Sequence, residues 1–174
     1  MADSDAPNAA DSLSREERAF LTALNDLGVR YLLVGMSAAL LQGATLATED
    51  INLWFEDIAD ERIGEAARRA GAAWVTRMQP PRLAGAAGER FDVVTTMDGL
   101  PDFAAEYAGS IAFDLGGLAI RVLPLQRIIA SKRAAGRAKD RAALVLLEAT
   151  ARLLQATAKR GRAPGPKEGR KRRS

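Results

Sequence analysis

The sequence predicts a mixed α/β (α+β) fold, in which a mixed β-sheet is flanked by helices and followed by a C-terminal helical segment. Short apolar runs of strand length alternate with longer stretches whose apolar residues recur every three or four positions. Glycine or proline separates most of these segments. The chain has 174 residues, 48% of them apolar, which is enough for one domain with its own core.

In the first half of the chain we expect helices and strands to alternate. Ser14 and Glu17 have the spacing of a capping box, and Gly28 is a plausible stop for the helix that begins near Ser12 or Ser14. The predicted elements that follow are a strand at 31–34, a helix at 37–42, a strand at 51–55 and a helix at about 60–70.

In the second half, β-branched and apolar runs predict further strands, and two helices close the chain. Gly116 and Gly117 separate two apolar runs, which indicates either a hairpin or a strand preceded by a loop. The predicted elements are a strand at 74–76, a loop at 80–88, a strand at 91–95, a turn at 97–99, the apolar runs 111–115 and 118–123, and helices at 124–135 and 139–158.

Charge divides the chain into a body and a tail. The net charge is +3, but eight basic residues and a single acid lie from Lys159 onward, so this tail carries +7 and the rest of the chain −4. We therefore expect a disordered N-terminus at 1–11, one domain at 12–158 and a basic, flexible tail at 159–174. Such a tail is suited to non-specific contact with nucleic acid, although the acidic body makes this a weaker candidate for the main function.

The composition excludes several classes of protein. The absence of cysteine rules out disulfides and thiolate metal sites, and the absence of histidine rules out Ser-His-Asp and Cys-His catalysis. No apolar run approaches the ~20 residues of a membrane span. The polar, acidic N-terminus lacks the basic region of a secretory signal, so we expect a cytoplasmic protein without a membrane partner.

Polar residues alternate with apolar ones at two of the predicted strands. Asp50 and Asn52 project to the same side, because residues two apart on a strand share a face. Asp92 follows Phe91 and precedes Val93 in the same alternating manner. If the two strands are neighbours, the three side chains converge, and Mg²⁺ is the usual counter-ion for such an oxygen-rich cluster.

The order and spacing of four motifs resemble the nucleotidyltransferase superfamily, close to the small bacterial minimal nucleotidyltransferases and abortive-infection-type proteins. Gly35 and Ser37 are similar to the glycine-serine turn, with Met36 between them. Asp50 matches the first metal carboxylate, Asp92 matches the third, and the segment 129–140 resembles the lysine-rich segment after the last strand. The resemblance extends over about residues 20–147.

This resemblance implies a metal-dependent enzyme that transfers a nucleoside monophosphate from a nucleoside triphosphate (NTP) to a hydroxyl acceptor. By the same resemblance, Asp50 and Asp92 would be catalytic and Mg²⁺ would be the cofactor. The implied metal ligands are Asp50, Asn52 and Asp92, and the implied nucleotide-binding residues are Gly35, Ser37, Lys132 and Lys139.

One residue departs from the family pattern. The second aspartate of the Asp-x-Asp motif is Asn52 here, which offers a neutral oxygen but no charge. An alternative interpretation is therefore a non-catalytic module of the same fold that binds a nucleotide or a protein partner. Structural roles are also open: Asp50 capping a turn, Ser37 capping the short helix after Gly35, and the lysines forming a solvated face.

Overall fold

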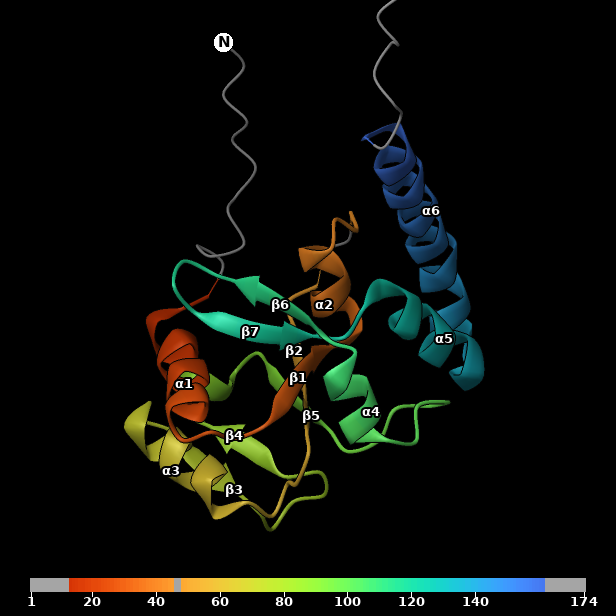
Figure 1. Cartoon of the computed structure of the whole chain (residues 1–174). Coiled ribbons are helices and arrows are strands. Elements are labelled where there is room, and N and C mark those ends of the chain that lie inside the picture. Colours follow the sequence, from red (N-terminus) through yellow and green to blue (C-terminus); the bar gives the residue numbers. More distant parts are fainter. Residues whose placement is uncertain (1–12, 46–47, 162–174) are drawn as a thin grey trace, which may run out of the picture.

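The computed structural model describes residues 13–45 and 48–161 and has a mixed α/β architecture (Figure 1). Its centre is a five-stranded sheet with the strand order β5-β2-β1-β7-β6. β2 runs antiparallel to β1 and parallel to β5, while β7 runs parallel to β1 and antiparallel to β6. The strands are β1 (Tyr31–Val34), β2 (Ile51–Phe55), β5 (Phe91–Val94), β6 (Ile111–Asp114) and β7 (Ala119–Val122). The predicted fold class is confirmed.

Helices cover both faces of this sheet (Figure 1). On one face α1 (Arg15–Asp26) contacts α3 (Glu61–Arg69). On the other face lie α4 (Phe103–Ala108) and α5 (Leu125–Ala135), and α6 (Ala138–Gly161) packs against α5. α2 (Gly35–Leu41) directly follows β1 and contacts α5. A second, two-stranded sheet consists of β3 (Ala73–Val75) and β4 (Arg82–Ala84), followed by the 3-10 turn η2 (Ala86–Gly88).

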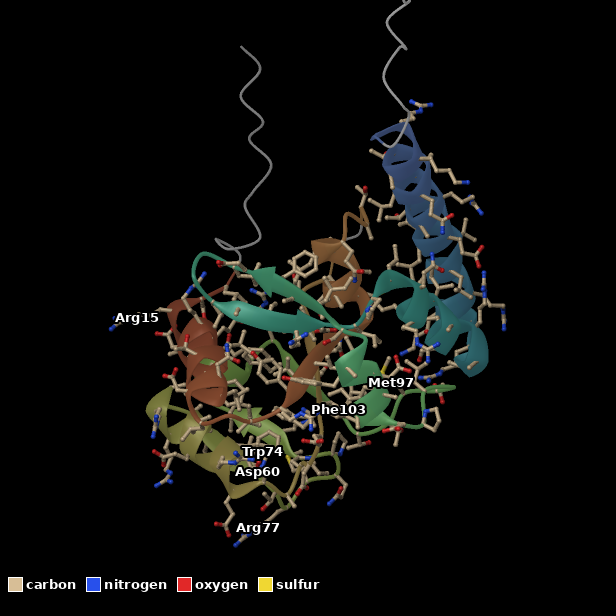
Figure 2. All side chains as sticks on the ribbon, viewed as in Figure 1. Arg15, Asp60, Trp74, Arg77, Met97 and Phe103 are labelled. Carbon is tan, nitrogen blue, oxygen red and sulfur yellow. The ribbon has the colours of Figure 1, made fainter. Side chains whose placement is uncertain are left out.

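Two ring contacts show which helix packs against β5 and which packs against β2. Phe20 of α1 packs against Phe91 of β5, with ring centroids 5.4 Å apart. Trp54 of β2 packs edge-on against Phe103 of α4, with centroids 5.2 Å apart; Figure 2 labels this phenylalanine. Because strand residues alternate between faces, Asn52 lies on the same face as Trp54, toward α4 and α5.

Several predicted elements agree closely with the structure. β1 and β2 have the predicted bounds, and the two apolar runs around Gly116 and Gly117 form an antiparallel hairpin, which resolves the alternative left open above. The capping box of α1 is present. The Glu17 backbone N–H donates to the Ser14 hydroxyl at 3.1 Å, and the Ser14 N–H donates to the Glu17 carboxylate at 2.8 Å.

Other predictions were wrong in ways that have physical explanations. The helix expected from Ser37 begins at Gly35, whose left-handed φ of 66° turns the chain directly out of β1. The segment 80–88, expected to be a loop, contains β4 and η2 because Leu83 is buried by pairing with β3. α4 was not predicted, since six residues are too few to display a helical period, although Asp102 caps it by accepting from the Ala104 N–H.

The last helix continues to Gly161 rather than ending near residue 158, so Lys159 and Arg160 belong to α6. The predicted disordered segment 1–11 and the basic residues after 161 lie outside the described residues. Within the described ranges, no helix combines the length and apolar character needed to cross a lipid bilayer.

The capping box gives a first prediction. Replacing Ser14 by alanine removes the acceptor for the Glu17 N–H, so we expect Ser14→Ala to lower the free energy of unfolding by about 1 kcal/mol in urea titrations. Thr22→Ala, an exposed position of the same helix, is the matched control and should not destabilise the protein. Equal stability of Ser14→Ala and the native chain would contradict a stabilising cap.

Candidate functional site

Pairing between β2 and β5 brings together the polar residues singled out in the sequence. Asn52 and Asp92 are direct register partners in this parallel pair. Asp50 lies immediately before β2, and the next residue, Ile51, donates its N–H to the Arg90 carbonyl at 2.6 Å. Asp50, Asn52 and Asp92 line one cavity, as the alternating pattern predicted. Both aspartates are exposed and Asn52 is half-buried.

This cavity of about 490 Å³ lies where β1 ends and where β2 and β5 begin, with α5 and α6 opposite. For brevity we call it the carboxylate cavity. Its sheet side carries the two acids and the amide, and its helix side carries Lys132 and Lys139. Two of the predicted nucleotide contacts therefore face the three predicted metal ligands across one space, although α5 and α6 are distant from β2 in the sequence.

Gly35 also lines the carboxylate cavity, and its position requires glycine. Its φ is 66°, in the left-handed region. A Cβ atom at this position would lie 3.1 Å from Nδ2 of Asn52, closer than side chains normally approach. The missing side chain therefore leaves room for the Asn52 amide beside the backbone at the end of β1.

Ser37 is the predicted site residue that the structure places elsewhere. Its hydroxyl donates to the Val34 carbonyl at 3.1 Å and accepts from the Asn52 backbone N–H at 3.4 Å. The N-cap of α2 is Val34, without a side-chain hydrogen bond, so the proposed capping role of Ser37 is wrong. Ser37 lines a neighbouring apolar cavity and ties α2 to the backbone of β2.

On the helix side, Lys132 is held by an acid that the sequence analysis did not assign to the site. Lys132 Nζ lies 2.9 Å from Oδ1 of Asp140, and their side chains are 19% and 6% exposed. Burial alone would raise the pKa of the Asp140 carboxyl, but the hydrogen bond from Lys132 and the charges of Lys132 and Arg137 hold the pKa below its ordinary value. In the sequence, Asp140 stands only at the start of the helix predicted at 139–158, and its pairing with Lys132 across Gly136 was not predicted.

The second oxygen of Asp140 is a buried polar atom without a hydrogen-bond partner among the described residues. The Nε atom of Arg137 is the neighbouring charge, at 3.3 Å. Arg137 also pairs with Asp98, on the turn after β5. Arg137 therefore links the turn after β5 to the first turn of α6 at the edge of the carboxylate cavity.

The donor set of the cavity can be compared with the requirements of Mg²⁺. The described residues contain no group of three or more acids, histidines or cysteines arranged to hold a metal ion. What the cavity offers is two carboxylates and one amide oxygen, all hard donors. Mg²⁺ commonly takes one or two protein carboxylates and completes its shell with water and substrate phosphates. The side chains present are therefore of the kind that Mg²⁺ takes as ligands.

Comparison with known proteins adds no assignment to this site. No known protein-family model matches the chain, and no curated protein sequence matches it. The interpretation of the carboxylate cavity consequently depends on its own residues. These are two exposed acids and an amide on one side, with Lys139 and the Lys132 that pairs with Asp140 on the other.

The ion pair between Lys132 and Asp140 can be tested through its effect on the stability of the protein. Asp140→Asn removes the charge that faces Lys132, and we expect it to lower the free energy of unfolding at pH 7 by about 1–3 kcal/mol. A depressed carboxyl pKa contributes stability above the ordinary carboxyl pKa and loses it as pH falls through the folded-state value. The gap between native and variant proteins should therefore narrow in urea titrations between about pH 5 and pH 3.

The control for this measurement is Asp26→Asn, at an exposed acid at the end of α1. This change should not lower stability, because an acid at a helix C-terminus opposes the helix dipole. A gap between Asp140→Asn and the native protein that stays constant down to pH 3 would contradict a stabilising role of the ionised Asp140 carboxylate.

The close approach at Gly35 gives a separate prediction. Gly35→Ala forces a non-glycine residue into positive φ and crowds the Asn52 amide, so we expect a loss of about 1–2 kcal/mol in the free energy of unfolding. Gly64→Ala, in α3 with open space around the added carbon, should instead stabilise the protein by about 0.5–1 kcal/mol. Stabilisation by both substitutions would show that Gly35 is replaceable.

Proposed function

We propose that the chain binds a magnesium complex of a nucleoside triphosphate in the carboxylate cavity and transfers the nucleoside monophosphate to a hydroxyl acceptor. The observation that carries this proposal is the convergence of Asp50, Asn52 and Asp92 opposite Lys132 in one open cavity. Acids on one side suit a divalent cation, and cations on the other side suit phosphate oxygens. The resemblance to nucleotidyltransferases rests on the same residues and leads to the same proposal.

Each group has a distinct role in this proposal. Asp50 and Asp92, with the Asn52 amide oxygen, would hold one Mg²⁺, which would supply positive charge to the triphosphate when bound. Lys132 would contact phosphate oxygens from a position fixed by Asp140. Lys139, exposed on the first turn of α6, would approach the phosphates from the same side.

The transfer itself is an exchange of one phosphorus–oxygen bond for another. The acceptor hydroxyl gives its proton to a carboxylate of the cavity, and its oxygen bonds to the α-phosphorus. The bond from that phosphorus to the oxygen bridging the α- and β-phosphates breaks. Pyrophosphate leaves with the electron pair, so atoms and charge balance without another reactant.

Asn52 lowers the expected efficiency of the proposed nucleotidyl transfer. A unit charge about 4 Å from another is worth on the order of 4 kcal/mol near a protein surface, so replacing a carboxylate by an amide weakens the hold on a cation substantially. This same residue favours a second candidate function: a module that binds the nucleotide without transferring it. Asn52 is the register partner of Asp92, so the negative charge that an aspartate would supply at position 52 is missing from the proposed metal-binding group.

Restoring the acid at position 52 tests both candidates. We expect Asn52→Asp to tighten Mg²⁺-dependent binding of ATP, GTP, CTP or UTP at least about tenfold in calorimetric titrations, because a third carboxylate faces the cation. Pyrophosphate release by the variant but not by the native chain would favour the binding module as the native function. Release by both would favour the enzyme.

The matched control adds an acid without touching the cavity. Asn25→Asp, an exposed asparagine at the far end of α1, makes the same chemical change and should leave nucleotide affinity unaltered. If neither the native chain nor Asn52→Asp binds any of the four nucleotides with Mg²⁺, the proposed function is wrong.

A further inference from the structure

A second cavity, of about 330 Å³, lies on the other side of β2 from the carboxylate cavity. It is mainly apolar, and we call it the leucine cavity. Its walls come from α1, α2 and the strands β1, β2 and β7. The apolar residues that line it include Leu21, Leu33, Leu40, Leu41, Ile51 and Ile120.

The two cavities meet at Asp50. Among the residues that line them, Thr48 and Asp50 belong to both. Asp50 lies at the start of β2, before the backbone enters the sheet, and its side chain is exposed. A carboxylate that the proposed function assigns to the reaction therefore also borders a space with apolar walls.

The remaining polar groups of the leucine cavity are engaged in holding the structure. Ser37 is bonded to the Val34 carbonyl and the Asn52 N–H. Arg90 donates to the Glu49 carbonyl at 2.8 Å and pairs with the buried Glu17 of α1 at 3.4 Å. These contacts leave the Thr48 hydroxyl and the Asp50 carboxylate as the polar groups at the mouth shared with the carboxylate cavity.

The cavity opens to solvent, so its apolar walls forgo the stabilisation that burial of apolar surface gives. Small-molecule sites typically combine apolar walls with a few polar groups that orient the ligand. Here the orienting groups lie at one end, toward the proposed nucleotide. The cavity therefore fits a molecule with an apolar body and one polar end.

We propose that the leucine cavity is the acceptor site and that it takes a small alcohol with an apolar body, whose hydroxyl is directed at Asp50. This inference rests on the proposed function, since it names the acceptor of the same transfer. The hydroxyl proton passes to a carboxylate of the carboxylate cavity as the hydroxyl oxygen bonds to the α-phosphorus of the NTP. Pyrophosphate leaves, and the product is the nucleoside monophosphate ester of the alcohol.

The first test measures binding alone, on the full native chain labelled with ¹⁵N. Titration with 1-hexanol should shift the backbone amide signals of Ser37, Leu40 and Leu41, whereas glycerol, with hydroxyls but no apolar body, should not. Leu41→Trp fills the cavity and should lose these shifts. Leu153→Trp, the same change at a side chain 69% exposed on α6, should keep them.

Absence of hexanol shifts in the native chain overturns the inference and leaves nucleotide binding untouched. Shifts that appear only after residues 1–11 are deleted would assign the cavity to the chain's own N-terminal segment and also overturn it. Shifts that persist in Leu41→Trp would place hexanol elsewhere, with the same consequence. Each of these outcomes is independent of whether the carboxylate cavity binds a nucleotide.

The second test measures transfer. The native chain and Asn52→Asp are incubated with Mg²⁺, each NTP and either 1-hexanol or glycerol, and the phosphate ester is detected by mass spectrometry. A hexyl ester that is lost in Leu41→Trp supports the acceptor site. Transfer to glycerol but not to hexanol overturns it while the proposed function survives. Hexanol binding without any nucleotide binding refutes the proposed function and the acceptor role together.

Discussion

The register of β2 between β1 and β5 is the constraint on which the candidate site depends. Val34, Asn52 and Asp92 lie in one row across these three strands. A slip of one residue in β2 would turn Asn52 toward α1 and bury a polar amide in the apolar layer. The same slip would turn Leu53 out of the core, where it is now only 1% exposed. Burial of the neighbouring apolar residues thus holds the polar face of β2 at the cavity.

The opposite side of the carboxylate cavity is built by a different kind of interaction. Lys132 belongs to α5 and Asp140 to α6, and their ion pair joins these two helices. A buried pair of this kind contributes little net stability but is costly to break from one side. Its consequence is positional, because Lys132 is kept at the cavity instead of turning away into solvent.

The sequence predicted the sheet side of the site better than the helix side. That Asp50 and Asn52 share a side follows from the period of two along one segment, which is a local property of the chain, whereas their meeting with Asp92 needed β2 and β5 to be neighbours. The role of Asp140 depends on how α6 returns along α5, and the position of Ser37 depends on where α2 leaves β1. Both are tertiary outcomes. β4 is a similar case, since its pairing with β3 outweighs the glycine- and proline-rich composition of its surroundings.

Asn52 connects the stability of the fold with its proposed chemistry. A third carboxylate beside Asp50 and Asp92 would add repulsion between like charges whenever no cation is bound. The amide avoids this repulsion and, with Gly35 leaving space for its Nδ2, fits closely against the end of β1. Compared with an aspartate at position 52, the asparagine therefore stabilises the protein when no cation is bound. A bound triphosphate would then depend more on contacts with Lys132 and Lys139, which belong to α5 and α6, than on a cation held at the sheet side of the cavity.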